Sequence, residues 1–506
     1  MDHCVGKTEN FHSHQFMYRK NDYLRIDMTG LGRNLRIRSR LQSVKIRKQP
    51  VERLLEFVQN NIQADTSRLL LDRHKWPDID IDTAVNCIES RIKLKNKVRE
   101  WYDNPHLIFP LKLSAEQCSS SLTGLYKADL AERIATRKDD QNETSAIAEG
   151  WKLADLTGGL GVDSWFFSKK ASQVLYCEMQ KALCDAARHN FTALMTGNIQ
   201  VRNCMVAPES EVHPETADCI SPESLLEGFR PDIIYLDPAR RGEGGKKVFL
   251  LEDCTPDILT LKDSLFKCSR NILLKLSPMA DITMVCERLG ACCREVHIVG
   301  AGGECKELLV WMDRDWNGEY EITAAELTSS EDGPVDSGHG YIAHTFTFRP
   351  SEEKSAVAQI AGKEEISAAS YLFEPGKAMM KAGGYNMLCA RFGLKKIGRS
   401  THYYIVCHEF HDADDPNHPA QQLKGISPEL QNMGKTFRIL ECSTLDKRSI
   451  KRIAADYPKA EVTARNLPMD TDTLRKKLGT SSSDTYHIFG LKSDTAGNIL
   501  ITTSRH

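Results

Sequence analysis

The fold of this chain is constrained most by residues 151–180, which read WKLADLTGGLGVDSWFFSKKASQVLYCEMQ. A short apolar run at residues 153–156 predicts a strand, and a glycine-rich turn follows it directly. Residues 162–169 suit a helix, and residues 174–176 suit a second strand. This succession predicts a βαβ unit, in which the two strands lie parallel in one sheet.

The turn and the end of the second strand predict a nucleoside site. Gly158, Gly159 and Gly161 allow positive φ angles and let backbone N–H groups approach a ligand. The start of the following helix adds the positive end of a dipole. Glu178 comes just past the second strand, where a carboxylate can accept both hydroxyls of a ribose.

The spacing of the glycines indicates which kind of nucleoside this turn would bind. It reads D-x-T-G-G-x-G-V-D, which is not the G-x-G-x-x-G pattern of dinucleotide sites. Asp163 at the helix start would repel a pyrophosphate, whereas a cationic sulfonium cofactor suits a turn flanked by Asp155 and Asp163. A nicotinamide dehydrogenase, which predicts NAD binding, and a turn that only connects strand to helix remain as alternatives.

A second anchor reads PDIIYLDPARR at residues 231–241. Residues 233–236 are typical of a central parallel strand that is buried on both faces. This strand ends in Asp237 and Pro238, at the carboxyl edge of the sheet, where ligands bind in such folds.

Together these motifs resemble class I S-adenosylmethionine-dependent methyltransferases. The resemblance implies an α/β, Rossmann-like core with a seven-stranded, mostly parallel sheet flanked by helices. It also implies that Asp237 lies beside the transferred methyl group, with Pro238 and Arg240 completing the catalytic tip. The cofactor-binding residues it implies are Asp155, Gly158, Gly159, Gly161, Asp163, Glu178, Asn203 and Asp237.

The tip also narrows the reaction. Amino-directed members of the family carry (D/N)-P-P-(Y/F/W), whereas this chain has Ala239 and Arg240 after Asp237-Pro238. Enzymes that methylate C5 of pyrimidines need a thiolate nucleophile, and no Cys stands at the two strand ends concerned. Direct transfer to a nitrogen or an oxygen remains, with Asp237 accepting a hydrogen bond from the nucleophile.

Length and composition predict several domains in a cytosolic protein. At 506 residues the chain is too long for one ordinary core, and its formal net charge is only −2. No apolar run of about 18 residues predicts a membrane span, and residues 1–16 lack the apolar core of a signal peptide. The 16 cysteines form no C-x-x-C pair and no zinc-like cluster, so we expect reduced thiols and no metal.

We expect four parts. They are a basic, disordered extension (1–50), a helical domain with a lid segment (51–135), a methyltransferase domain (136–325) and an α+β, ferredoxin-like domain (326–506).

Polar residues around the expected site are candidates for substrate contacts. Gln117, Tyr126 and Lys127 lie in a polar segment before the glycine turn, which could close over the cofactor or merely connect two elements. Arg240 and Arg241 begin a basic loop that could grip phosphates or simply be exposed. Lys275 and Ser277 stand at the end of the strand expected at residues 272–276.

The C-terminal part strengthens the resemblance. The segments EQCSSSLTGLYKA, LLKLSPMAD, LFEPGKAMMKAG and ARNLP, with the two anchors, resemble a bacterial family of predicted methyltransferases with a THUMP-like C-terminal domain. True THUMP domains deliver RNA to modification enzymes, so the resemblance implies RNA, either tRNA or rRNA, as partner. Lys377, Arg465 and Lys476 are candidates for contacts with the RNA backbone, or belong to an ordinary solvated face.

We therefore expect an RNA methyltransferase that uses S-adenosylmethionine. The alternatives are a methyltransferase for a small molecule or a protein, and a non-enzymatic RNA-binding protein with a vestigial cofactor site. The sequence leaves the oligomeric state open.

Overall fold

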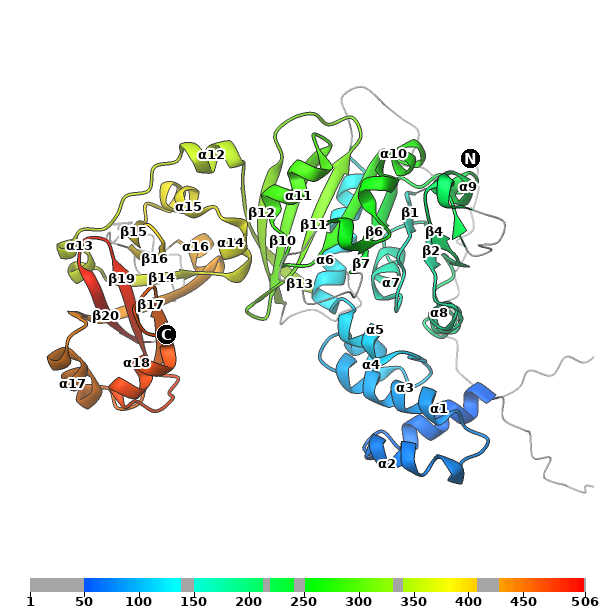
Figure 1. The fold of residues 1–506 in the computed structure, drawn as a ribbon, viewed down its shortest axis with the longest axis horizontal. Coiled ribbons are helices and arrows are strands. Elements are labelled where there is room, and N and C mark those ends of the chain that lie inside the picture. The colour runs from blue at the N-terminus through cyan, green and yellow to red at the C-terminus, as the bar shows by residue number, and fades with distance from the viewer. Residues whose placement is uncertain are drawn as a thin grey trace, which may run out of the picture. The chain divides into compact units, whose positions relative to one another are not determined.

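The computed structural model describes residues 50–137, 150–212, 219–240, 251–330, 340–406 and 427–504 (Figure 1). The chain divides into Met1–Lys48 and Gln49–His506. The predicted basic extension thus falls almost entirely outside the described residues.

The described part begins with helices. α3 starts where Asp80 accepts a hydrogen bond from the Thr83 backbone N–H at 3.2 Å, and α6 starts with a capping box formed by Ser120 and Thr123. The bounds are α1 (Pro50–Asn60), α2 (Thr66–Leu71), a 3-10 turn (Arg73–Lys75), α3 (Ile81–Leu94), α4 (Arg99–Asp103), α5 (Lys112–Gln117) and α6 (Ser121–Ala135).

A nine-stranded sheet follows, in the order β13-β12-β10-β11-β9-β6-β1-β2-β3. Its strands are β1 (Lys152–Asp155), β2 (Gln173–Glu178), β3 (Ile199–Asn203), β6 (Ile233–Leu236), β9 (Asn271–Leu276), β10 (Cys293–Ala301), β11 (Glu304–Asp313), β12 (Glu321–Ser329) and β13 (Tyr341–Phe348).

Seven of these strands form the expected Rossmann-like core. β3, β2, β1, β6 and β9 are parallel, and β11 lies antiparallel between β9 and β10. The predicted α/β fold class is confirmed, and β12 and β13 extend the sheet by two strands. The boundary expected at residues 325/326 falls inside β12, because the sheet continues where the sequence reads as mixed.

Side chains of the central strands alternate between two apolar clusters, one on each face of the sheet. Ile233, Tyr235 and Leu273 belong to one apolar cluster, with residues of α6, α7 (Val162–Ser168) and α8 (Lys181–Ala193). Ile234 and Leu274 point to the other cluster, with α9 (Pro222–Leu226), α10 (Ile258–Cys268) and α11 (Ile282–Leu289). Successive side chains of a strand point to opposite faces, so a strand that is buried twice needs apolar residues throughout.

Two short ladders lie beside this sheet. β4 (Met205–Val206) pairs with β5 (Cys219–Ile220), and β7 (Ala239–Arg240) pairs with β8 (Cys254–Thr255). Two 3-10 turns span Glu209–Glu211 and Leu251–Asp253.

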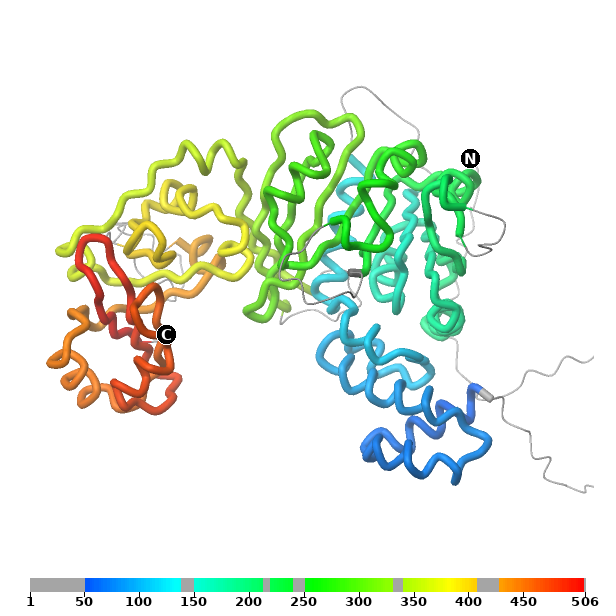
Figure 2. Tube along the Cα trace, in the orientation of Figure 1, coloured from blue at the N-terminus to red at the C-terminus, as the bar shows by residue number. Residues whose placement is uncertain are grey.

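A second sheet of seven strands forms the C-terminal α+β region, in the order β15-β16-β14-β17-β20-β19-β18. Figure 2 traces the Cα path of this region in yellow, orange and red. Its strands are β14 (Tyr371–Pro375), β15 (Lys395–Gly398), β16 (Thr401–Val406), β17 (Gly434–Thr444), β18 (Glu461–Arg465), β19 (Tyr486–Ser493) and β20 (Gly497–Ser504). The helices are α12 (Pro350–Ser355), α13 (Lys363–Ala368), α14 (Lys377–Ala382), α15 (Tyr385–Phe392), α16 (Pro428–Asn432), α17 (Lys447–Asp456) and α18 (Thr471–Leu478). No helix of the described segments is long and apolar enough to cross a bilayer.

Candidate active site

The candidate site lies at the carboxyl edge of the first sheet. Because β1, β2, β6 and β9 run parallel, their last residues meet at this edge. Asp155 ends β1, Glu178 ends β2, and Asp237 and Ser277 follow β6 and β9. Motifs that lie far apart in the sequence therefore converge at this edge. Thr157 and Asp237, for example, are 80 residues apart and share a hydrogen bond.

The glycine turn is fixed by steric contacts that only glycine permits. A Cβ on Gly158 would lie 2.2 Å from the buried ring of Tyr176. Gly161 caps α7 with φ of 93°, a left-handed angle that other residues adopt only with strain. The backbone thus passes tightly over β2 and leads straight into α7.

Glu178 is the residue that links the turn to the second strand. Its Oε2 accepts the Gly159 backbone N–H at 2.9 Å, and its Oε1 accepts that of Gln180 at 2.7 Å. Asn203 Nδ2 donates to the backbone oxygens of Glu178 and Met179, at 2.8 and 3.0 Å. A carboxylate has about four lone-pair directions, so Glu178 retains acceptor capacity for two hydroxyls. The residues present therefore fit a nucleoside.

Asp155 is held beneath the turn rather than on its surface. Its carboxylate accepts hydrogen bonds from the Thr157 backbone N–H at 3.1 Å and from Ser164 Oγ at 2.5 Å. Burial raises the pKa of Asp155 to about 7, although both hydrogen bonds oppose that rise. Around neutral pH this group can therefore gain or lose a proton.

Asp163, at the start of α7, is buried among donors. Its Oδ2 accepts hydrogen bonds from Ser119 Oγ at 3.0 Å and Tyr235 Oη at 2.8 Å, and Lys127 Nζ lies 3.3 Å from its Oδ1. Burial alone would raise the pKa of Asp163, but the ammonium groups of Lys127 and Lys275 outweigh burial and lower it. This carboxylate therefore stays ionised.

Asp237 is fixed on two sides. Its backbone N–H donates to Thr157 Oγ1 at 2.6 Å, and its Oδ2 accepts from Lys275 Nζ at 2.6 Å. The Lys275 side chain is 11% exposed, whereas that of Asp237 is 40% exposed. Burial lowers the pKa of Lys275, but Asp237, Asp163 and Glu307 more than reverse this and raise it. Lys275 is thus a permanent ammonium donor that faces Asp237, not the solvent.

Lys127 is fully buried and joins α6 to the sheet. Its Nζ donates to Glu307 Oε1 at 2.6 Å and to Ser119 Oγ at 2.9 Å. This burial corrects the expectation of a substrate contact, because an enclosed ammonium positions its partners and cannot reach a bound molecule. Burial raises the pKa of Glu307, against the opposing effect of Lys127 and Lys275.

Tyr126 needs the same correction. It is buried on α6, and its hydroxyl lies 2.7 Å from His297 Nδ1 on β10. Gln117, the last residue of α5, is exposed and remains a candidate for substrate contact.

The remaining predicted residues are placed as follows. Pro238 and Ser277 are half-buried at the same edge as Asp237. Arg241 and the side chain of Arg240 lie outside the described residues. Lys377, Arg465 and Lys476 are exposed on α14, β18 and α18. Within the described segments, no group of His, Cys, Asp and Glu could hold a metal ion.

Sequence reasoning missed Glu307 and Tyr235. Glu307 precedes the apolar run of β11 and is 3% exposed. A charged residue directly before a buried apolar run was the available signal, since such a group is rarely buried unless paired.

Comparisons with known proteins agree with this architecture. Residues 371–412 match a family model described as a ferredoxin-like domain, and residues 434–505 match one described as THUMP domain-like. A crystal structure from Porphyromonas gingivalis W83, provisionally assigned as a methyltransferase, is 26% identical, with a TM-score of 0.68. The match covers 90% of this chain and 98% of that one. Over most of its length the chain is thus similar to a structure assigned provisionally as a methyltransferase, and its C-terminal part matches ferredoxin-like and THUMP domain-like models.

Two more distant structures match a smaller share of the chain. A SAM-dependent methyltransferase from Aquifex aeolicus is 13% identical, covering 38% of this chain and 92% of that one, with a TM-score of 0.25. The T. thermophilus 16S rRNA N2 G1207 methyltransferase, in complex with AdoMet and guanosine, is 15% identical, covering 41% and 46%, with a TM-score of 0.26. A comparison with curated proteins gave no match.

The buried ion pairs predict a large effect of Lys127→Met on stability. The substitution leaves Glu307 and Asp163 buried without this ammonium, which should lower the free energy of unfolding by about 3–5 kcal/mol. Urea denaturation followed by tryptophan fluorescence measures this, because Trp165 and Trp311 belong to the same apolar cluster as α6.

The matched controls separate the network from a general loss of charge. Lys112→Met breaks an exposed 2.8 Å pair with Glu89 and should change stability by less than about 1 kcal/mol. Lys127→Met with Glu307→Leu should recover much of the loss. A loss in Lys127→Met no larger than in Lys112→Met would contradict the network.

Proposed function

We propose that this chain is an S-adenosylmethionine-dependent methyltransferase that acts on RNA, either tRNA or rRNA, at a nitrogen or an oxygen. The observation that carries the proposal is the convergence of the glycine turn, Glu178 and Asp237. These groups meet at the carboxyl edge of a sheet whose seven core strands have the order β3-β2-β1-β6-β9-β11-β10. The methyltransferase-like match over 90% of the chain supports it.

The cofactor would be held by the turn and the acids around it. Glu178 would accept the ribose hydroxyls, the backbone around Gly159 would line the methionine end, and Asn203 would meet the adenine while fixing the Glu178 backbone. When bound, S-adenosylmethionine supplies an electrophilic methyl group. Asp155 and Asp163 place negative charge beneath this region, which favours a cationic ligand.

Asp237 is the group suited to act on the nucleophile. Thr157 and Lys275 fix its backbone and one carboxylate oxygen, while 40% of its side chain stays exposed. Asp237 would accept a hydrogen bond from the attacking amino or hydroxyl group and orient it toward the methyl group. Positioning of this kind supplies much of the acceleration in a direct transfer.

The C-terminal region supports RNA as the substrate. The THUMP domain-like segment spans residues 434–505 and includes α18, whose last turn carries Arg475, Lys476 and Lys477. Arg475 is half-buried and pairs with Asp472 and Glu461. With Arg465 and Lys377, the exposed Lys476 and Lys477 would contact phosphates of the RNA backbone. A methyltransferase for a small molecule or a protein would not need such contacts.

Transfer of a labelled methyl group tests the proposal. With tritiated S-adenosylmethionine, the wild-type chain should label the tRNA or the rRNA fraction of total RNA. Asp237→Asn should lower kcat by about 100-fold, because an amide oxygen accepts the nucleophile's hydrogen bond more weakly than a carboxylate and cannot take up its proton. Its affinity for S-adenosylmethionine should stay nearly unchanged.

The matched control is Asp185→Asn on α8, which alters an exposed acid and should leave kcat unchanged. Label appearing only in protein or small-molecule fractions would contradict the RNA substrate. Unchanged turnover in Asp237→Asn would contradict its role.

The raised pKa of Asp155 predicts pH-dependent binding. A cationic sulfonium favours the carboxylate form, so binding should lower this pKa and release a proton. The affinity for S-adenosylmethionine should therefore rise by about three- to tenfold from about pH 6 to about pH 8. S-adenosylhomocysteine, which lacks the sulfonium charge, should show a smaller change. Calorimetry in buffers of different ionisation enthalpy measures the released proton, and Asp155→Asn should abolish it; an equal pH dependence for both ligands would contradict the argument.

A further inference from the structure

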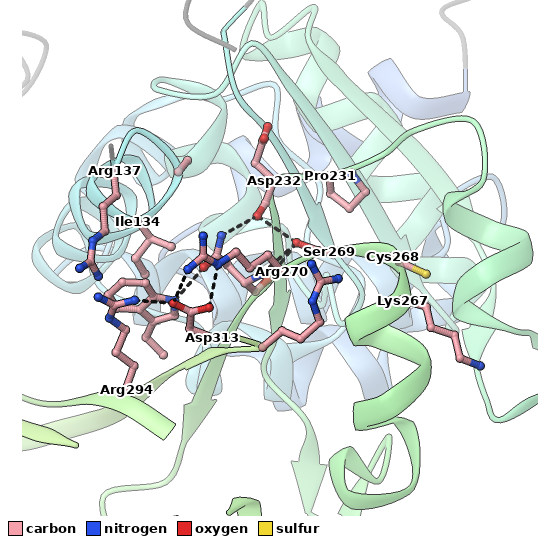
Figure 3. A pocket seen from close by; sticks show the side chains of 14 residues that line it. Ile134, Arg137, Pro231, Asp232, Lys267, Cys268, Ser269, Arg270, Arg294 and Asp313 are labelled. Carbon is pink, nitrogen blue, oxygen red and sulfur yellow. Dashed lines mark hydrogen bonds and ion pairs between the residues drawn. The ribbon is translucent and has the colours of Figure 1, made fainter. Parts of the chain in front are cut away.

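Helix α6 runs across the first sheet from one edge to the other. Its last turn lines a cavity of about 510 Å³ at the amino ends of β6 and β9, beside the ion pair of Arg270 with Asp313 (Figure 3). The α5–α6 junction, residues 118–120, lies at the opposite edge, because its Ser119 contacts Asp163 of the candidate site. The junction and the amino-terminal half of α6 therefore adjoin that site.

Lys97, in the turn between α3 and α4, holds the end of α5 that leads into this junction. Its Nζ donates hydrogen bonds to the backbone oxygens of Ala115 at 3.4 Å and Cys118 at 3.2 Å, and also to that of Glu116. The last carbonyls of a helix have no partner within the helix, and a nearby cation stabilises them. Lys97 therefore fixes the carboxyl end of α5.

The same turn also holds the start of α6. The Lys97 backbone oxygen accepts a hydrogen bond from the Ser121 N–H at 2.8 Å. Ser121 Oγ donates to Glu100 Oε2, on α4, at 3.0 Å. The α5–α6 junction is thus anchored on both sides by residues of the N-terminal helices.

The junction places Ser119 between two charged groups of the candidate site. Ser119 is 6% exposed, and its Oγ donates to Asp163 Oδ2 at 3.0 Å and accepts from Lys127 Nζ at 2.9 Å. Asp163 lies in the first turn of α7, directly after the glycine turn that ends in Gly161. A shift of the junction would therefore reach the glycine turn through one side chain.

We propose that Lys97 is a positioning residue for the cofactor site, which acts through Ser119 on Asp163. This gives the N-terminal helices a part in the site, because they hold one of its walls and do not contact the ligand. A wall that is already fixed loses little conformational entropy when a ligand binds. The inference rests on the proposed use of S-adenosylmethionine, whose positive charge Asp163 would favour.

Calorimetric titration of S-adenosylmethionine into Lys97→Met, Ser119→Ala and the double variant tests this role. Each single variant should bind about five- to tenfold more weakly, because the junction or its contact with Asp163 is lost. The double variant should bind little more weakly than Ser119→Ala, since the two residues act in series. Lys97→Arg keeps a cation with several donors and should restore most of the affinity.

Lys93→Met is the matched control. Lys93 lies on α3, four residues before Lys97, and pairs with Glu116 of α5, but its side chain is 50% exposed. This variant should bind S-adenosylmethionine as the wild type does. Wild-type affinity in Lys97→Met, or losses that simply add in the double variant, would overturn the proposal.

Hydrogen exchange followed by mass spectrometry separates this inference from a failure of the proposed function. In Lys97→Met without cofactor, peptides that contain Ser121 and the glycine turn should exchange at least about tenfold faster than in the wild type. If the wild type does not bind S-adenosylmethionine, the proposed function fails and this exchange decides the role of Lys97. Faster exchange confined to α3, α4 and α5 would overturn the proposal, as would faster exchange throughout the first sheet, which indicates general unfolding.

Discussion

A buried network of two ammonium groups and three carboxylates governs the candidate site. Lys127 contacts Glu307 and Asp163, and Lys275 contacts Asp237 and lies within 4.0 Å of Asp163 and Glu307. A buried charge without its partner costs several kcal/mol, so each member requires the others in place. The network ties α6, α7, β9 and β11 together just behind the carboxyl edge of the sheet.

This arrangement explains how the candidate site at the sheet edge can keep a fixed geometry. Asp237 is exposed enough to meet a substrate, yet its position is set by Lys275 and Thr157. Glu178 independently fixes the glycine turn, where the nucleoside part of the cofactor would bind, because its carboxylate accepts a hydrogen bond from the Gly159 backbone N–H. Cofactor binding and methyl transfer would thus be supported by separate contacts. Direct transfer needs such preorganisation, because positioning of the reactants supplies most of the rate acceleration.

From the sequence we could predict the parts of the site that lie in a single strand and the turn directly after it. A glycine turn needs Gly158 and Gly161 for local steric reasons, and Asp237 ends an apolar strand, so both are readable from a short window. The α/β class and the core of seven strands were implied by the resemblance to class I methyltransferases. The roles of these residues in binding and catalysis stay predictions.

Features that depend on distant segments were not readable. From the sequence, Lys127 is predicted to be a lid residue. Only the packing of α6 against β11 shows that its ammonium group donates a hydrogen bond to Glu307. β13 was unreadable because its fully buried residues cluster at one end, at Phe346 and Phe348, and do not alternate along its whole length.

Calorimetric titration of S-adenosylmethionine into the wild-type chain and into Glu178→Ala tests the central claim most directly. The account predicts micromolar binding to the wild type, about −8 kcal/mol, and no measurable binding to the variant. Glu211→Ala, an exposed acid in the 3-10 turn Glu209–Glu211, should bind as the wild type does. No binding to the wild type, or equal binding to Glu178→Ala, would mean that the turn and Glu178 form a structural connection and not a cofactor site.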